Sequence, residues 1–344
     1  MKTVLQIVTL CFVVLLPGSV VLAQTPGGYK VTDKIKVGGE GGWDYLIADG
    51  ASHRLYVSHA THVAVIDTKT NTVVGDIPNT LGVHGIALAP KLGRGYTSNG
   101  RANTVTVFDL KTLKMLDTVP VQGTNPDAIL FDPYSERVFT FNGRSSNATA
   151  IDAKTNAVIG TIPLEGKPEF AVTDLHGKIY VNIEDKSQVK EFDAKTLKVL
   201  STWSLAPGEE PSGLAIDRKH SRLFSVCGNK MMIVLDAKSG KVVASVPTGA
   251  GTDAAAFDPG TEFAFASNGE GTLTVVHEDS PGKFSVVENV ATQRGSRTMA
   301  LDDVTHRLYL SGALFGATPA PTAERPRPRP SMEPDSFMVL VLGR

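Results

Sequence analysis

The chain has 344 residues, 42% of them hydrophobic, and its 33 glycines and 20 prolines suit many short strands joined by tight turns. Its 34 Lys and Arg residues against 35 Asp and Glu leave a net charge of −1. This balance argues against a nucleic-acid-binding surface, which needs a basic excess, so we expect no nucleic acid among the partners.

Residues 1–23 have the pattern of a cleavable secretory signal peptide. Lys2 gives a positive start, residues 4–16 form an apolar stretch too short to span a bilayer comfortably, and Val21 and Ala23 offer small residues before the cleavage point. The alternative is a retained N-terminal anchor. We expect a periplasmic or extracellular protein with no membrane span after signal removal. Cys227 is then the single cysteine, so no intramolecular disulfide can form.

A motif of about 42 residues recurs along the rest of the chain. Its clearest copies end in an aspartate tag, such as the one that runs from Asp67 to Asn71, and the tag aspartates are Asp67, Asp109, Asp152, Asp193 and Asp236. A β-rich repeat of this length indicates a propeller with one blade per repeat. Seven inner strands can be placed, near Tyr45, Ile86, Ile129, Ala171, Leu214, Ala255 and Met299.

The sequence therefore predicts an all-β fold, a seven-bladed β-propeller of four-stranded antiparallel blades. Length alone would suggest two domains, but the ring is one unit, so residues 24–344 are expected to form a single domain. In the second repeat the four strands are expected over residues 85–90, 94–98, 104–108 and 115–119. The tag aspartate is expected to accept backbone N–H bonds in the turn that follows.

The last two repeats depart from this pattern. His277, Glu278 and Asp279 replace the usual tag of the sixth repeat. In the seventh repeat, an insertion follows the second strand, and the third strand is expected only at residues 337–341. Between the second and third strands of the seventh repeat, residues 319–334 are rich in Arg and Pro and cannot form a sheet ladder. We expect them to form an extended polyproline loop on the surface.

The seventh repeat lacks an outer strand, because the chain ends after its third strand. Residues 31–37 have the pattern of an outer strand such as residues 158–162. We expect this N-terminal strand to complete the last blade and close the ring, which removes an exposed sheet edge.

The strand Arg54, Leu55, Tyr56, Val57 and Ser58, with the tag from Asp67 to Thr70, resembles the YVTN-type (YncE-like) β-propeller repeat family of secreted bacterial proteins. The resemblance covers roughly residues 29–344. It implies a seven-bladed extracytoplasmic propeller and carries no catalytic signature, because its recurrent residues are strand and turn positions.

Two sets of loops share one face of a propeller, and they vary between blades here while the strand tags do not. Function concentrates on such loops, so we expect ligands to bind at this channel-mouth face. The candidate ligand-binding residues are Trp43, His84, Asn99, Asp127, Asn142, Glu169, Glu184, Glu210, Asn229, Asp253, Asn268 and Arg297.

Acids and amides follow one another around this predicted mouth. They could form an oxygen-ligand cage for a divalent cation such as calcium, with Glu169, Glu210 and Asp253 as candidate metal ligands. The alternative is that the Asn-Gly and Asp residues are there as turn formers. Glutamates are harder to explain as turn residues.

A transition-metal site is a second interpretation of the polar loops. His59, His62 and His84 lie on neighbouring loops, and Cys227 with Met231 and Met232 would add soft ligands. The alternative is that these are polar loop histidines. His53, His220 and His306 each precede a second strand and are interpreted as turn residues.

Two classes of function remain open. The first is a binding or scaffold propeller that holds a small ligand, a glycan or a protein. The second is a metal-dependent hydrolase of a lactone or similar small ester, in the manner of gluconolactonase-like propellers, where a cation polarises the carbonyl and activates water. The sequence holds no Gly-x-Ser-x-Gly elbow for a serine nucleophile, and its catalytic residues cannot be named.

Overall fold

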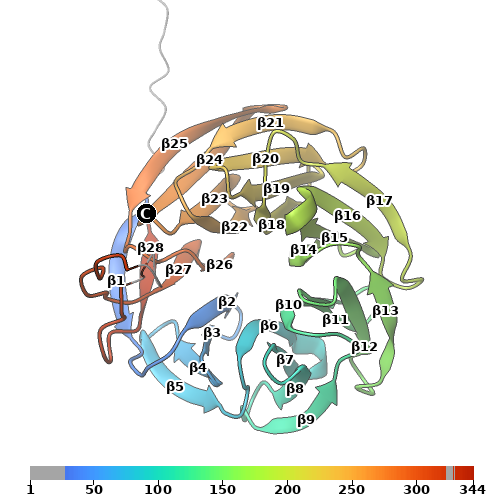
Figure 1. Ribbon diagram of the computed structural model, residues 1–344, viewed down its shortest axis with the longest axis horizontal. Coiled ribbons are helices and arrows are strands. Elements are labelled where there is room, and N and C mark those ends of the chain that lie inside the picture. Colours follow the sequence, from blue (N-terminus) through green and yellow to red (C-terminus); the bar gives the residue numbers. More distant parts are fainter. Residues whose placement is uncertain (1–27, 323–327, 329) are drawn as a thin grey trace, which may run out of the picture.

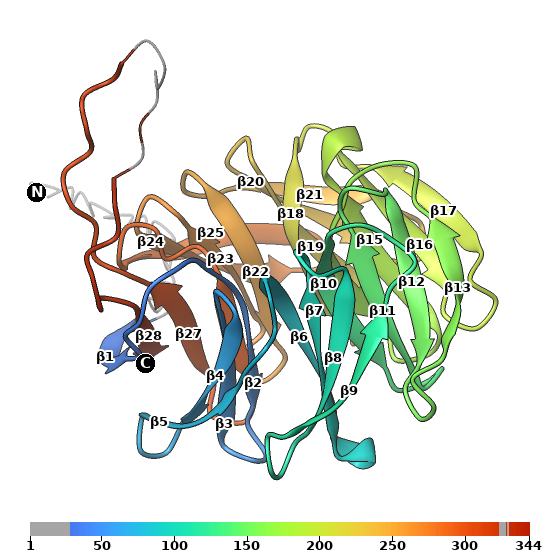
Figure 2. The same cartoon turned by 60° about the horizontal axis from the view of Figure 1, so that its bottom comes forward.

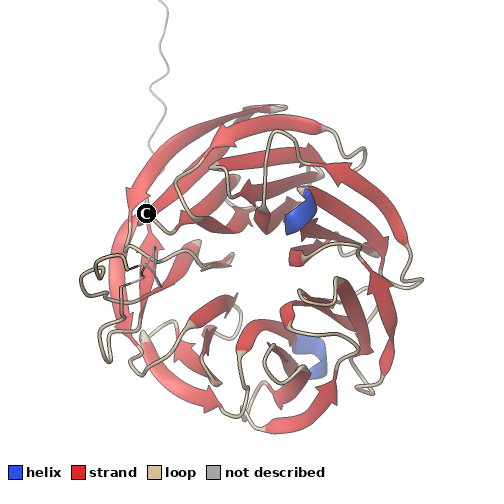
Figure 3. Ribbon diagram, in the orientation of Figure 1, coloured by secondary structure: helices blue, strands red, loops and turns tan. Residues whose placement is uncertain are grey.

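The computed structural model describes residues 28–322, 328 and 330–344. Its strands form seven four-stranded antiparallel sheets arranged around one axis, as Figure 1 shows. In the described residues, helix is limited to two short 3₁₀ turns, visible in blue in Figure 3. The predicted seven-bladed β-propeller is confirmed. The predicted signal peptide, residues 1–23, lies outside the described residues.

The first six blades are meanders in which four consecutive strands run from the axis to the rim. Blade one contains β2 (Trp43–Asp49), β3 (Arg54–His59), β4 (His62–Asp67) and β5 (Thr72–Ile77). Blade two contains β6 (Val83–Ala89), β7 (Arg94–Asn99), β8 (Thr104–Asp109) and β9 (Met115–Pro120). Blade three contains β10 (Pro126–Asp132), β11 (Arg137–Asn142), β12 (Asn147–Asp152) and β13 (Val158–Pro163). Blade four contains β14 (Pro168–Thr173), β15 (Lys178–Ile183), β16 (Gln188–Asp193) and β17 (Val199–Ser204). Blade five contains β18 (Pro211–Asp217), β19 (Arg222–Cys227), β20 (Met231–Asp236) and β21 (Val242–Pro247). Blade six contains β22 (Thr252–Asp258), β23 (Phe263–Asn268), β24 (Thr272–Ser280) and β25 (Lys283–Ala291). The 3₁₀ turns are η1 (Pro90–Leu92) and η2 (Glu184–Lys186).

Blade seven is assembled from both ends of the described chain. Its sheet has the order β1-β28-β27-β26, with β26 (Met299–Asp302), β27 (Arg307–Gly312), β28 (Met338–Gly343) and β1 (Lys30–Lys36). β1 pairs antiparallel with β28, for example Ile35 opposite Val339. The predicted closure of the ring by an N-terminal strand is therefore confirmed.

The hydrophobic core lies between the blades. The buried apolar residues of the described chain fall into seven clusters, and each cluster joins two neighbouring blades. One of them brings Ile35 of β1 and Val339 of β28 against Leu46 and Val57 of blade one. The two central strands of a blade have neighbours on both faces, which explains their nearly continuous apolar character.

The aspartate tags close the turns between third and fourth strands. Asp67 Oδ1 accepts hydrogen bonds from the backbone N–H groups of Lys69 (2.8 Å) and Thr70 (3.0 Å), and the same arrangement recurs at the other four tag aspartates. These N–H donors lower the pKa of Asp67, led by the bond from Thr70. The tags are therefore structural, as expected.

The Arg- and Pro-rich insertion rises from blade seven on the face where the inner strands begin, as Figure 2 shows for its described part. Its base is held by a bridge between Phe315 and Met332, and the Phe315 ring lies 6.2 Å from Trp43. Residues 323–327 and 329 of the predicted polyproline loop lie outside the described residues. Within the described chain, a search for helices with the length and apolarity to cross a membrane finds none.

If β1 fastens the ring by packing, then shortening its core side chain should destabilise the whole propeller. We expect Ile35→Ala to lower the free energy of unfolding by about 2–4 kcal/mol, because Ile35 is buried between blades seven and one. Lys34→Ala, on the exposed face of the same strand, should change it by less than about 0.5 kcal/mol. Urea unfolding measures both, and equal effects of the two changes would contradict the closure model.

Candidate functional site

One residue from each blade forms a ring around the axis at the channel mouth. Asp44 lies two positions before Leu46, the residue at which regular pairing with the second strand starts. The other blades have a residue at the same position, although in blade six regular pairing already starts at Ala254, directly after Asp253. We call these seven residues the mouth ring: Asp44, His84, Asp127, Glu169, Ser212, Asp253 and Arg297. Four acids, two basic residues and one serine therefore face a common centre.

A β-bulge at the start of each of the first six inner strands aims these side chains. In blade one the pairing passes from Trp43 with His59 to Leu46 with Val57, so two residues of β2 oppose the single residue Ser58. Bulges of this kind re-aim a side chain near functional sites. Ser58 Oγ accepts a hydrogen bond from the Asp44 N–H (3.0 Å), which fixes the bulge.

Neighbouring blades also hold the backbone of the mouth ring. Ser98 of blade two donates to the carbonyl of Asp127, and Ser267 of blade six donates to that of Arg297. The Ser212 hydroxyl donates to the Asp253 carbonyl (2.9 Å). These bonds run from one blade to the next, so the geometry of the mouth ring depends on the closed propeller.

The aromatic side chains of Tyr45 and Phe170 form the floor below the mouth ring. Tyr45 of blade one and Phe170 of blade four approach to 5.2 Å between ring centroids, so they meet across the channel. Below them lies a cavity of about 220 Å³ with a mainly apolar lining that includes Leu46, Ile86 and Ile129. The polar mouth is therefore separated from an apolar channel.

His84 is the centre of the closest polar group in the mouth ring. Its Nδ1 lies 2.6 Å from Asp44 Oδ2 and 3.7 Å from Asp127 Oδ1. Burial opposes the charged imidazolium, but the hydrogen bond with Asp44 and the negative charge of Asp127 outweigh it and raise the pKa of His84 to about 9. A pKa in this range favours the imidazolium at neutral pH, hydrogen-bonded to Asp44 and in ion-pair contact with Asp127.

The other acids are paired with basic residues on the rim. Lys167 Nζ lies 2.7 Å from Glu169 Oε1 and also contacts Glu184, and Arg297 Nε lies 3.3 Å from Asp253 Oδ2. Lys167 and Arg297 are about half exposed, so their neutralising effect is weakened by solvent. The acids themselves are more deeply placed than the basic groups that face them.

Burial and mutual repulsion make three ring carboxyls weaker acids than usual. Burial, followed by the charge of Asp44, raises the pKa of Asp127 to about 6. Burial, with the charge of Asp127, raises the pKa of Glu169 to about 7, and burial raises that of Asp253 to about 6 against the opposing charge of Arg297. Keeping these carboxyls charged in the ring is therefore costly, and either protonation or a bound cation would relieve that cost.

A polar cavity of about 530 Å³ lies above this group, and we call it the mouth cavity. Asp44 and His84 form part of its wall, and three arginines from blades two, three and seven line it as well. They are Arg101, Arg144 and Arg297, and Asn103 and Asn125 add amide groups. The mouth thus combines an acidic base with a basic rim.

The structure brings together five of the residues that the sequence singled out. His84, Asp127, Glu169, Asp253 and Arg297 all belong to the mouth ring, and Glu184 joins them through Lys167. Asp44 and Ser212 were missed. Alignment of the repeats on the inner-strand residues Leu46 and Leu214 would have found both, because they occupy the same position as the other five.

Three predicted amides have a different role. The side chain of Asn99 is almost wholly buried, accepts from Thr97 and donates to Thr104 and Thr106 inside its own blade. Asn142 and Asn268 make equivalent bonds to threonines of blades three and six. These side chains hold second and third strands together, so the structure does not bring them into the mouth ring.

Trp43, Glu210 and Asn229 also lie apart from the ring. Trp43 stacks on Phe337 at 5.1 Å while lining the mouth cavity, and Asn229 bonds to the backbone of residues Pro207 and Glu209. Glu210 is exposed, with its backbone bonded to Gly228. The proposed calcium set of Glu169, Glu210 and Asp253 is therefore divided, with two members in the ring and one outside it.

The predicted soft-ligand group is not assembled either. Cys227 is fully buried in the core between blades four and five, where burial raises the pKa of its thiol to about 12. His59 stacks on Phe337 at 4.3 Å and lies beside His62, and burial lowers the pKa of His59 to about 4. At the mouth, the ligand atoms that lie within 4.8 Å of one another belong to Asp44, His84 and Asp127.

Comparison with known proteins supports the fold and leaves the family open. No family model matches the chain, and no curated protein matches its sequence. Among solved structures, hydrazine synthase of Kuenenia stuttgartiensis is similar, with a TM-score of 0.68 over 86% of this chain and 95% of that chain. The identity is 16%, so this similarity shows a shared propeller architecture alone.

The raised pKa values predict that Asp127, Glu169 and Asp253 each cost stability at neutral pH. A carboxyl whose pKa rises to about 6 on folding contributes stability below pH 4 that is lost as the pH passes 6. We expect Asp127→Asn to raise the free energy of unfolding by about 1 kcal/mol at pH 7, with the gain falling to zero near pH 4. Urea unfolding over this pH range measures the effect. Glu210→Gln on the same face is the control and should show no such trend, and a loss of stability at pH 7 in Asp127→Asn would contradict the prediction.

Proposed function

We propose that this protein is a binding propeller whose mouth ring holds a divalent cation and whose mouth cavity takes a small anionic ligand above it. The observation that carries the proposal is the group of Asp44, His84 and Asp127, whose ligand atoms lie within 4.8 Å of one another beneath a cavity lined by arginines. A cation on this group would face the cavity where three cationic side chains already gather.

The donor set favours a transition metal over calcium. Two carboxylates and an imidazole suit zinc, manganese or iron, whereas calcium prefers six or more oxygen ligands. Glu169 lies close enough for the charge of Asp127 to raise its pKa and for its own charge to help raise that of His84, so it would add to the negative potential at the metal. The proposed metal ligands therefore shift from the calcium set expected from sequence to Asp44, His84 and Asp127.

The cavity above supports an anionic ligand. Arg101, Arg144 and Arg297 come from three blades, and arginine binds carboxylate and phosphate groups in a fork geometry. A small carboxylate or phosphate could contact the metal and two arginines at once. Asn103 and Asn125 in the same wall would add hydrogen bonds that set orientation.

A metal-dependent hydrolase is the second candidate, and one observation favours it. Burial and the charge of Asp127 raise the pKa of Glu169 to about 7, which is the range where a carboxylate acts well as a general base. With a metal to polarise a lactone or ester carbonyl, Glu169 could take the proton from an attacking water. The binding function needs no such step, so turnover separates the two.

The setting that we propose follows from the sequence features. The signal-like residues 1–23 support secretion to the periplasm or the extracellular space. The mature chain would keep one cysteine, Cys227, so it would form no internal disulfide there. The repeated tags support membership of the YVTN-type, YncE-like repeat family. The propeller fold fits a scaffold or binding role in either compartment.

Metal titration of the purified protein tests the proposal. We expect zinc or manganese to bind by calorimetry, and Asp44→Asn to weaken this binding by at least about tenfold, because it removes a charged ligand. Affinity should rise from pH 6 to pH 9, since the metal must displace the proton of His84, whose pKa is about 9.

The control for this experiment is Glu210→Gln, an exposed acid of the same face that lies outside the ring. It should leave the metal affinity unchanged. Absence of binding to the parent protein at millimolar metal, or equal effects of the two variants, would overturn the cation site. Lactone turnover that requires the metal and is lost in Glu169→Gln would favour the hydrolase over the binding function.

A further inference from the structure

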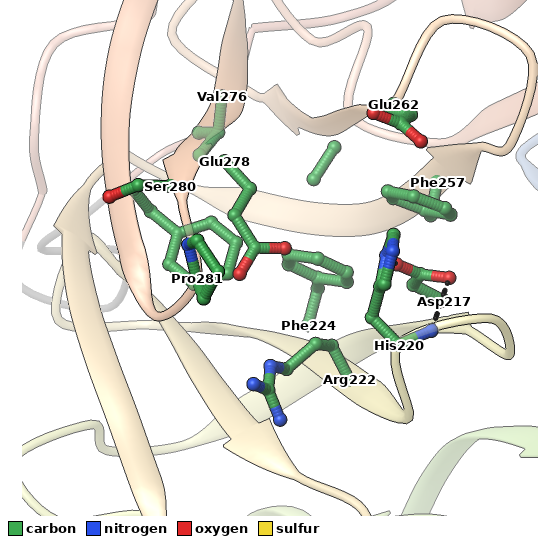
Figure 4. A pocket seen from close by; sticks show the side chains of 12 residues that line it. Asp217, His220, Arg222, Phe224, Phe257, Glu262, Val276, Glu278, Ser280 and Pro281 are labelled. Atoms are coloured by element: carbon green, nitrogen blue, oxygen red, sulfur yellow. Dashed lines mark hydrogen bonds and ion pairs between the residues drawn. The ribbon is translucent and has the colours of Figure 1, made fainter.

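A second cavity lies at the opposite end of the strands, at the junction between blades five and six. It has a volume of about 320 Å³, and we call it the junction cavity. Figure 4 shows its lining, in which Phe224 and Phe257 are seen with Glu278 and His220 around them. The lining residues come from the ends of β18 and β24 and the start of β19, so this cavity lies on the face away from the mouth ring.

Three of the other junctions on this face are closed by side-chain bonds from one blade to the next. Arg94 of blade two donates to the carbonyls of Ala153 (3.0 Å) and Lys154 (2.9 Å) in the tag turn of blade three. Arg137 of blade three does the same to the tag turn of blade four, with 2.7 Å to each of two carbonyls. The hydroxyls of Tyr96 and Tyr180 also donate to tag-turn carbonyls of the following blade.

The junction between blades five and six has lost these bonds in three ways. Blade six has no aspartate tag, and β24 continues through Ser280 into a longer hairpin. Arg222, the counterpart of Arg94, turns back to Asp236 of its own blade at 2.7 Å. Phe224 stands where Tyr96 and Tyr180 stand in their blades, and it has no hydroxyl. The junction cavity lies where these contacts would otherwise be made.

Aromatic rings form the inner wall of the cavity. Phe224 is fully buried and stacks on Phe257, with centroids 5.3 Å apart and an interplanar angle of 7°. Phe284 meets Phe224 edge to face at 5.8 Å. Phe257 and Phe284 remain part exposed in spite of their size. A wall of this kind suits the flat apolar body of a small ligand and the face of each ring attracts a cation.

The charged residues of the lining are paired except for one. His220 Nδ1 bonds to Asp217 Oδ2 at 2.6 Å, and Asp217 Oδ1 accepts from the N–H groups of Lys219 and His220. Glu262 pairs with Lys219 at 2.8 Å.

Glu278 is the exception. Its Oε1 accepts from the backbone N–H of Gly282 (2.8 Å), and within the described residues it has no ion pair with a basic side chain. Figure 4 shows the Glu278 carboxylate beside the rings labelled Phe224 and Pro281. The cavity therefore offers one carboxylate that has no ion pair within the described residues and lies next to an aromatic wall.

We propose that the junction cavity is a second binding site, for a small organic cation that joins a protonated amine to a flat apolar group. The amine would bond to Glu278, and the apolar group would lie against Phe257 and Phe284. The volume of about 320 Å³ is at the lower end of the range for ligand sites and fits a molecule with a single ring. This site is independent of the mouth ring and of the function proposed for it.

A metal ion fits this cavity less well than an organic cation does. Ligand atoms of Asp217, His220 and Glu278 lie within 4.8 Å of one another. However, both oxygens of Asp217 and the Nδ1 of His220 already bond within their own turn. A metal would have to break these bonds, and it would leave the three aromatic rings unused.

Binding of phenethylammonium to the full chain tests the proposal, with 2-phenylethanol as the uncharged probe of similar shape. We expect phenethylammonium to bind by calorimetry or ligand-observed NMR, and the alcohol to bind at least about tenfold more weakly, because it lacks the charge-assisted bond to Glu278. Glu278→Gln should weaken phenethylammonium by about tenfold, and Phe257→Leu by a smaller factor.

Two control variants make the result specific. Glu262→Gln changes an acid of the same cavity that already pairs with Lys219, and Asp127→Asn changes the mouth ring. Both should leave phenethylammonium affinity within about twofold, and melting temperatures establish that each variant is folded. The proposal is overturned if phenethylammonium does not bind at millimolar concentration, if the alcohol binds equally well, or if Glu262→Gln or Asp127→Asn weakens binding as much as Glu278→Gln. Zinc that displaces phenethylammonium and binds more weakly in Asp217→Asn would also overturn it in favour of a metal site.

Discussion

Packing between neighbouring blades is the interaction on which the rest of this protein depends. Each of the seven core clusters joins two blades, so a blade buries its apolar faces only when both neighbours are present. The last of these junctions requires β1, which comes from the opposite end of the described chain and pairs with β28. Closure therefore turns a row of marginal sheets into one cooperative unit, and β1 covers the edge of β28 that would otherwise be unpaired.

The same closure creates the mouth site. Each blade contributes a single residue to the ring, and side chains as distant in the sequence as Asp44 and Arg297 face one centre only in the closed propeller. Bonds from one blade to the backbone of the next, such as Ser98 to Asp127, fix their positions. Burial at the mouth, together with repulsion between neighbouring acids, raises the pKa values of Asp127, Glu169 and Asp253, so these carboxyls cost stability at neutral pH.

Blades six and seven depart from the repeat pattern, and each departure changes the surface of the propeller beside it. In blade seven, the insertion is anchored by the Phe315 bridge and brings Phe315 near Trp43, beside the mouth. In blade six, the loss of the aspartate tag and the extension of β24 leave a cavity at a place where three other junctions carry an arginine or tyrosine contact. His220, interpreted from the sequence as a turn residue, is one, but its turn also lines this cavity.

The sequence by itself determined the architecture, because the 42-residue period, the aspartate tags and the outer-strand pattern of residues 31–37 are local signals that each blade repeats. It also placed five of the seven mouth-ring residues on the channel-mouth face. Only the tertiary structure decided which loop side chains reach the axis. The reason is that a bulge register turns Asp44 and Ser212 inward, whereas the buried amides of Asn99, Asn142 and Asn268 bond to threonines of their own blades. The sequence pattern of a polar residue beside a turn is the same whether its side chain faces the axis or bonds within its own blade. Strand pairing and the neighbouring blade decide which way the side chain points.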